Sequence, residues 1–211
     1  MKNHGKQYRG KHRRSRGLTM IELIMVLAVI LITSAISMPS FIRAYQRYQV
    51  DDAATRMANV IKFTRYEAIR LNTPISYVIG ATPAGTTIAW TDSIANGAPD
   101  PVERQALFSP NVTLIAAGNL PGGAVPRLVL AANVGPLIPL SNTAAAVQFD
   151  QRGAVNPPPA GALVSFVGNT GFPTAGYRAV ILLPSGSMQL WQMTPDPNGN
   201  GIGNANWIYL H

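Results

Sequence analysis

The sequence contains no cysteine and only three histidines among its 211 residues. Without cysteine the chain can form neither a disulfide framework nor a thiolate metal site. The histidines are His4, His12 and His211, so two of them precede Gly17 and the third is the final residue. A Ser-His-Asp or Cys-His catalytic site would have to use that final residue. We therefore expect a protein that is not an enzyme and that needs no cofactor.

Acidic residues are scarce too, and the positive charge that they leave is unevenly distributed. Nine Asp and Glu stand against seventeen Lys and Arg, which gives a formal net charge of +8. Seven of the seventeen basic residues precede Leu18, which leaves ten against nine acids in the remainder of the chain. The high net charge is thus a property of the N-terminal segment, and it does not indicate a basic nucleic-acid-binding domain.

Glycine and proline are nearly missing from one long stretch. Between Leu18 and Thr73 there is no glycine and one proline, Pro39, whereas sixteen of each occur from Pro74 onward. A stretch without helix breakers followed by dense turn residues predicts one long helix and then a domain of short strands. We expect four parts: a basic leader over 1–17, an apolar half-helix over 18–39, an amphipathic half-helix over 40–73 and a β-rich globular domain over 74–211.

The apolar half-helix is long enough to cross a membrane. Leu18 to Met38 gives 21 residues with one charge, Glu22, and a helix needs about 20 apolar residues to span a bilayer core. A buried helix of a soluble protein is the alternative. The flanks favour the membrane, because seven basic residues precede the run and only Arg43 and Arg47 follow it closely. This asymmetry predicts a single pass with the N-terminus in the cytoplasm and the domain on the other side.

A cleaved secretory signal is a second alternative, since "TSAISMP" at the end of the run offers small residues for cleavage. Glu22 disfavours it. An ionised carboxylate in such a segment costs roughly 2.5–3.5 kcal/mol on insertion scales, and an intramembrane acid therefore calls for a partner. If the chain is cut after Gly17, Leu18 gains an α-amino group one helical turn from Glu22. The carboxylate could then pair with that amine or with the amine of a neighbouring copy, and the helix dipole would also favour it.

These residues resemble a known signature. The run "RGLTMIEL" is similar to the type IV prepilin motif, in which a basic leader ends in glycine and the mature chain begins with an apolar residue, Thr, two apolar residues and Glu. Leu18 replaces the usual Phe and Met20 the usual Leu, and both remain apolar. The resemblance implies that a membrane-embedded prepilin peptidase cuts after Gly17 and methylates the amine of Leu18. It also implies that Glu22 acts in assembly and that Pro39 kinks the helix.

The second half of the helix has an apolar stripe that we expect to pack against the domain, and Pro74 should end it. After Pro74, runs rich in β-branched and aromatic residues predict strands in an antiparallel arrangement. The fold class is therefore α+β and pilin-like, a long transmembrane and amphipathic helix packed on an antiparallel β-sheet domain. The stripe consists of Val50, Ala54, Met57, Ile61, Ala68 and Leu71. The strands are predicted at 75–80, 87–91, 112–117, 127–132, 145–150, 162–167, 177–183, 187–193 and 207–210.

Two fragments of the domain, "VQFDQRG" ending at Gly153 and "YRAVILLPSGSMQLW", resemble the FimT and GspH minor pseudopilins. The resemblance implies a structural subunit of a type II secretion pseudopilus, held in the bacterial inner membrane with its domain in the periplasm. Its partners would be other pseudopilins or pilins, the prepilin peptidase and the assembly platform of the secretion machine. The alternative is a FimT-like minor pilin of a type IV pilus, acting in pilus initiation or DNA uptake.

Two binding functions are weighed and disfavoured. Some FimT-like pilins capture DNA through an arginine-rich turn, but here the turn from Gly186 to Gln189 has no charge, and four arginines face five acids after residue 73. Phosphate binding needs clustered cations, so we do not expect a nucleic-acid partner. Asp196 to Gly201 matches the first half of a calcium loop, yet Trp207 stands where a bidentate Glu is required. We favour a turn rich in Asn and Gly over a metal site there.

Overall fold

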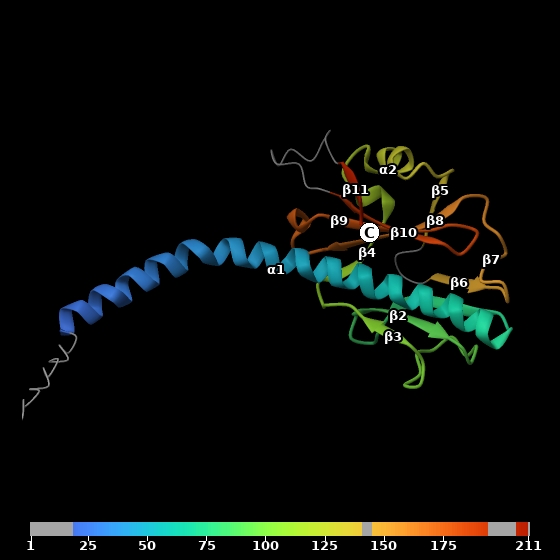
Figure 1. The fold of residues 1–211 in the computed structure, drawn as a ribbon, viewed down its shortest axis with the longest axis horizontal. Helices are drawn as coiled ribbons and strands as arrows, with labels where there is room; N and C mark the ends of the chain where they lie inside the picture. The colour runs from blue at the N-terminus through green and yellow to red at the C-terminus, as the bar shows by residue number, and fades with distance from the viewer. Residues whose placement is uncertain (1–18, 141–144, 194–205, 211) are drawn as a thin grey trace, which may run out of the picture. The chain divides into compact units, whose positions relative to one another are not determined.

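The computed structural model describes residues 19–140, 145–193 and 206–210. A single helix, α1 (Met20–Leu71), occupies the first part of the described chain. The chain divides into two compact units, Met1–Phe41 and Ile42–His211, and α1 runs from the first into the second. Figure 1 shows α1 as one continuous coil that leads into a domain made mainly of strands. The predicted fold class is confirmed.

The apolar half of α1 stays helical through Pro39, which lies inside it. Proline has no N–H to donate to the carbonyl one turn earlier. Two hydroxyl groups of this half bond within the helix: Thr33 Oγ1 donates to the Val29 carbonyl at 2.9 Å, and Ser37 Oγ donates to the Thr33 carbonyl at 2.9 Å. These polar side chains are thereby satisfied without water, as a lipid environment requires. The kink expected at Pro39 remains a prediction.

The C-terminal end of α1 is closed by a Schellman motif. Asn72 is in the left-handed region with φ 51°, and its N–H donates to the Ile69 carbonyl at 3.3 Å. The N–H of Thr73 donates to the Ala68 carbonyl at 3.2 Å, which is the second bond of the motif. Pro74 follows and prevents the helix from resuming. The sequence predicted the stop from Pro74, and Asn72 supplies the cap.

The strands form two sheets. The first has the order β3–β2–β1–β6–β7, and β1 pairs with both β2 and β6 in antiparallel register. Its strands are β1 (Ile75–Ala81), β2 (Thr87–Asp92), β3 (Gln105–Leu107), β6 (Ala145–Phe149) and β7 (Val155–Asn156). The second has the order β11–β10–β9–β8–β4. Its strands are β4 (Val112–Ile115), β8 (Ala162–Asn169), β9 (Tyr177–Leu182), β10 (Met188–Met193) and β11 (Trp207–Leu210), and a sixth strand, β5 (Leu137–Pro139), pairs with β8 outside this order.

Burial in the second sheet follows the two-residue period of a strand. In β8, Leu163 and Val167 join the core cluster that contains the inner face of α1, whereas Val164 and Phe166 join a second cluster with Leu128. Leu128 belongs to α2 (Ala124–Ala132), so this sheet is covered by α1 and the first sheet on one face and by α2 on the other. Both faces being buried explains the nearly continuous apolar runs of β8 and β9.

Three details of the sequence prediction were wrong. The run 127–132, predicted as a strand, belongs to the helix α2, whose buried side chains Ala124, Leu128 and Ala132 recur every four residues. The arrangement is not wholly antiparallel, since β5 (Leu137–Pro139) pairs with β8 in parallel. Leu71 is 46% exposed rather than part of the buried stripe, because it is the last helical residue and the chain turns away at Asn72.

One buried ion pair ties α1 to β9. Arg178 lies on the face of β9 that points toward α1 and is 1% exposed, and its guanidinium pairs with the carboxylate of Asp51. Its terminal nitrogen also donates to the Tyr177 carbonyl at 3.0 Å. A buried guanidinium that loses its carboxylate pays a large desolvation cost. Asp51 therefore fixes the position of α1 along the sheet at the start of the packed region.

We expect Asp51→Asn to lower the free energy of unfolding by about 3 kcal/mol, the low end for a broken buried pair, because the Asp51 side chain is itself 42% exposed. The matched control is Asp52→Asn, which removes an exposed pair with Arg56 at 2.8 Å that contributes at most about 0.5 kcal/mol. Thermal unfolding of the full chain in detergent, followed by circular dichroism, measures both. Equal losses for the two variants would contradict the assignment.

Candidate assembly site

The start of α1 carries the residues that the sequence placed in processing and assembly. Gly17 and Leu18 lie outside the described residues. The structure describes the motif from Thr19 onward, and this part includes Glu22. Thr19 caps the helix, since its Oγ1 accepts the N–H of Glu22 at 3.3 Å and its carbonyl accepts the N–H of Leu23 at 3.1 Å. Glu22 is exposed and lies in the first turn.

The spacing Thr19-x-x-Glu22 has the pattern of a capping box, in which the hydroxyl bonds the third N–H of the helix and the glutamate can bond back to the capping residue. The roles predicted for Glu22 were charge pairing and an interaction with the helix dipole. The capping-box pattern was missed, although Ser or Thr followed three residues later by Glu is visible in the sequence. A bond from the Glu22 carboxylate back to Thr19 would give this side chain a local structural role beside assembly, and the two roles predict different effects of Glu22→Gln.

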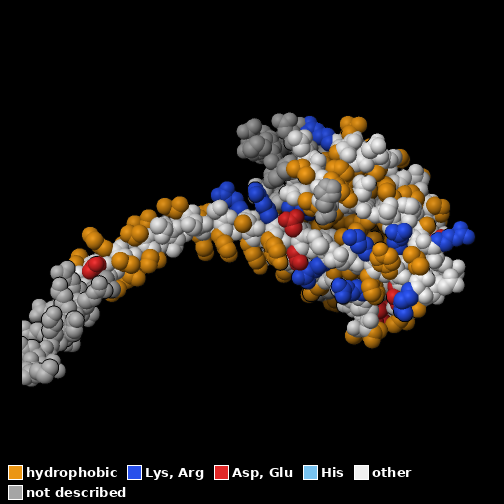
Figure 2. All heavy atoms as spheres, in the orientation of Figure 1, with side chains coloured by type: hydrophobic (Ala, Val, Ile, Leu, Met, Phe, Trp, Pro, Cys, Tyr) orange, Lys and Arg blue, Asp and Glu red, His pale blue; other side chains and the backbone are white. Residues whose placement is uncertain are grey.

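The apolar half of α1 exposes its large side chains on all sides. From Met20 to Phe41 these side chains are between about half and four-fifths exposed, with Met20 at 81% and Val26 at 49%. Figure 2 shows hydrophobic side chains along the length of this segment. The helix meets the length and hydropathy of a membrane span, and none of its most apolar window is buried in the protein. A helix that is apolar on every face needs lipid or other apolar helices around it.

The two domain fragments that resembled minor pseudopilins meet in space. Gly153 (φ 76°) and Gly186 (φ 78°) each end a tight turn, and an added Cβ at Gly186 would lie 1.9 Å from the Gly153 carbonyl oxygen. Arg65 of α1 closes the contact, since its Nε donates to that same carbonyl at 3.0 Å. The Val155 N–H donates to the Pro184 carbonyl at 3.0 Å. We call this contact the glycine junction, and only glycine allows both turns to approach so closely.

Models of known protein families match both of these regions. A family model described as Type II transport protein GspH matches residues 53–186, which include most of the packed part of α1 and the glycine junction. The chain belongs to the GspH family. A model of the prokaryotic N-terminal methylation motif matches residues 12–38, which include Gly17, Leu18 and Glu22. The chain is therefore a type IV pilin-like minor pseudopilin.

Individual relatives are similar to this GspH-family chain over part of its length. The pilin-like protein PilA1 of Thermus thermophilus is 32% identical over 88 residues, which are 42% of this chain and 55% of PilA1. The chain thus spans about half the length of that relative. Two crystal structures of the type IV minor pilin FimU of Pseudomonas aeruginosa are similar at 16% identity. They give TM-scores of 0.45 and 0.43 and cover 68% and 66% of this chain and 89% and 90% of FimU.

Other binding chemistry is sparse in the described part of this GspH-family domain. No group of three or more His, Cys, Asp or Glu there could hold a metal ion. The candidate calcium loop from Asp196 to Gly201 lies outside the described residues. The turn at Gly186 is bonded by Ser185 and Ser187, whose hydroxyls are 2.8 Å apart, and no cationic side chain belongs to it. On α1, a hydrogen bond from Arg70 lowers the pKa of the Glu67 carboxyl below its ordinary value.

Proposed function

We propose that the protein is a minor pseudopilin of a type II secretion pseudopilus. The observation that carries the proposal is one uninterrupted helix that joins a methylation motif to a GspH domain. In this proposal the apolar half of α1 anchors the chain in the bacterial inner membrane, with the N-terminus cytoplasmic and the domain periplasmic. The prepilin peptidase cuts after Gly17 and methylates Leu18. The assembly platform then moves the subunit into a fibre with other pseudopilins.

The physical basis of assembly is the same exposed surface that makes the helix a membrane anchor. A helix apolar on every face can exchange lipid for neighbouring helices with little change in its surroundings. The contact between successive subunits is heterologous and does not close, which is the geometry that produces a filament. Glu22 is the single ionisable side chain between Thr19 and Phe41, and we assign it the pairing with the amine of Leu18 on an adjoining subunit. That pairing would fix the register of the stack.

A second candidate function is a FimT-like minor pilin of a type IV pilus, which the 32% identity to the pilin-like protein PilA1 favours. The two machines differ in what a deletion of the gene removes. Loss of protein export to the medium, with surface pili and DNA uptake intact, supports the secretion pseudopilus. The reverse pattern supports the pilus, and it would contradict the proposal.

We expect Gly17→Leu to block processing completely. A peptidase subsite that admits a residue without a side chain excludes a leucine there, so the full-length chain should accumulate in the inner membrane with its domain in the periplasm. Gly10→Leu is the matched control, because Gly10 also follows an arginine in the leader but is followed by a lysine. Mass spectrometry of the N-terminus distinguishes the outcomes. A normal methylated Leu18 terminus from the Gly17 variant would rule the proposal out.

A further inference from the structure

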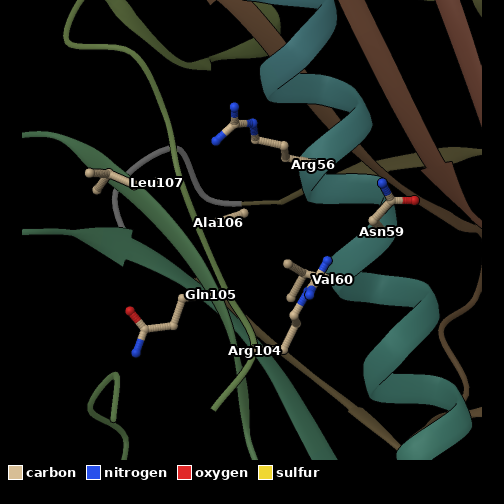
Figure 3. Close-up of a pocket in the computed structure, with 7 residues that line it drawn as sticks. All are labelled: Arg56, Asn59, Val60, Arg104, Gln105, Ala106 and Leu107. Atoms are coloured by element: carbon tan, nitrogen blue, oxygen red, sulfur yellow. The ribbon is translucent and has the colours of Figure 1, made fainter. Parts of the chain in front are cut away.

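A polar notch lies between α1 and β3, the edge strand of the first sheet. Its volume is about 310 Å³, and Val60 and Ala106 form part of its lining. Figure 3 shows Arg56 extending from α1 toward the strand side and Arg104, which directly precedes β3, extending toward α1. Two arginines from separate elements thus line one small space. The notch is separate from the apolar half of α1 and from the glycine junction.

The charge of Arg104 is not balanced within the described chain. Arg104 is exposed and forms no ion pair with any described acid. The adjacent Glu103 does not serve, because it is turned inward and is 8% exposed. Its carboxylate accepts the N–H groups of Ser93 at 2.7 Å and Asp100 at 3.2 Å. The charge of Glu103 is therefore bonded inside the domain, whereas the charge of the adjacent Arg104 is exposed at the surface.

Arg56 has unused capacity as well. Its Nε donates to the Asp52 carboxylate at 2.9 Å, while its side chain remains 55% exposed. A guanidinium carries five N–H donors, and a carboxylate is the group that it binds with two parallel bonds. The two arginines share this lining with the apolar side chains of Val60, Ala106 and Leu107, so the notch is suited to a carboxylate that is carried among apolar neighbours.

The rim of the notch favours a protein as the carrier of that carboxylate. Leu107 lines the notch and is 53% exposed, and Val102 nearby in sequence is 85% exposed. Among the described strands, β3 pairs with β2 alone, so one side of this edge strand is available to an extended segment. Nucleic acid would need a longer row of cations to follow successive phosphates. Exposed apolar side chains around two arginines match a protein interface better, because arginine is enriched at the centre of such interfaces.

We propose that this notch binds an acidic side chain of a neighbouring pilin-family subunit, with Arg104 as the anchoring residue and Arg56 as the second donor. The neighbour contributes an Asp or Glu flanked by apolar residues, which cover Leu107 while the carboxylate meets the two guanidinium groups. This inference rests on the proposed function, because it presupposes that subunits pack side by side. It adds a contact between the globular domains to the contact between the apolar halves of α1.

The test uses the full chain in native membranes that contain its partner subunits. A photo-cross-linking amino acid replaces Leu107 at the notch. In two other variants it replaces Leu130, which is 80% exposed on α2, or Ile30 in the apolar half of α1. We expect position 107 to cross-link to a pilin-family subunit and position 130 to give no such product. Position 30 reports independently whether the apolar half of α1 packs against a neighbouring subunit. Absence of the product at position 107 while position 30 still cross-links would overturn the notch and leave the proposed function standing.

Charge variants then identify the anchor. Arg104→Gln should lower the cross-linking yield at position 107 by about tenfold, the factor for losing a hydrogen bond to a charged group, and Arg104→Glu should abolish it. Arg152→Gln, an exposed arginine on the turn of Gly153, should leave the yield unchanged. Equal yields from all three variants would overturn the assignment of Arg104. So would retention of an oligonucleotide by the purified full chain that Arg104→Gln removes, since the partner would then be nucleic acid. Absence of cross-links from position 30, in a chain that carries no charge substitution, would contradict the proposed function itself.

Discussion

Gly186→Ala is expected to lower the free energy of unfolding by about 4 kcal/mol, which combines backbone strain with forced displacement of a packed neighbour. The strain arises because Gly186 has φ 78°, a region that costs alanine about 1–2 kcal/mol. The displacement arises because the new Cβ would lie 1.9 Å from the carbonyl oxygen of Gly153. That oxygen cannot give way easily, since it also accepts the Nε–H of Arg65 at 3.0 Å. Opening the junction therefore separates α1 from both turns.

Gly85→Ala is the matched control for this prediction. Gly85 has nearly the same backbone conformation, φ 77°, but nothing lies within 4 Å of an added Cβ. It should lose only the strain of about 1–2 kcal/mol. The difference between the two variants isolates the close approach, and denaturant unfolding of the full chain in detergent measures it. If both glycines lose the same amount, the glycine junction contributes nothing beyond its backbone conformation.

The sequence was sufficient for features that depend on local chemistry. The breaker-free stretch predicted α1, and runs rich in β-branched and aromatic residues predicted β1, β2 and β8 to β11 near their observed bounds. Short elements were missed, since β3, β5 and β7 have only two or three residues each. The run 127–132 was wrongly predicted as a strand, because its six residues include Val and Leu, which are common in strands. Gly123 before it, Pro126 in the first turn and Asn133 after it were the helix boundary signals that should have decided.

Contacts between distant parts of the chain could not be predicted. Arg178 and Asp51 are 127 positions apart, and nothing in either segment indicates that they meet. Gly153 and Gly186 were recognised separately as turn residues, but their contact depends on how β6, β7, β9 and β10 are ordered in two sheets. The notch beside Arg104 likewise depends on β3 becoming an edge strand. Local patterns specify elements, whereas partners across the fold follow from topology.

Glu22→Ala is expected to reduce recovery of partner pseudopilins to background while leaving membrane insertion and cleavage after Gly17 intact. In a dry stack of helices, removing one member of a buried ion pair costs about 3–5 kcal/mol, since the remaining ammonium has no counterion. In the single subunit Glu22 lies in the first turn of α1, which the proposed membrane anchor would place near the membrane surface, where water can solvate it. The measurement is co-purification or cross-linking with partner subunits, made on membranes that contain equal amounts of processed protein.

The capping box makes Glu22→Gln the deciding variant. Glutamine can still bond back to the backbone at Thr19 and so retains the cap, but it removes the charge. If pairing with the amine of Leu18 is what matters, Glu22→Gln should fail in assembly as fully as Glu22→Ala. Thr19→Ala, which removes the observed bond from the Glu22 N–H to Thr19 Oγ1, should cost only about 1 kcal/mol of helix stability and leave partner recovery nearly unchanged. Recovery that is normal with Glu22→Gln and lost with Thr19→Ala would show that the motif acts by starting the helix, and the ion-pair role of Glu22 would have to be abandoned.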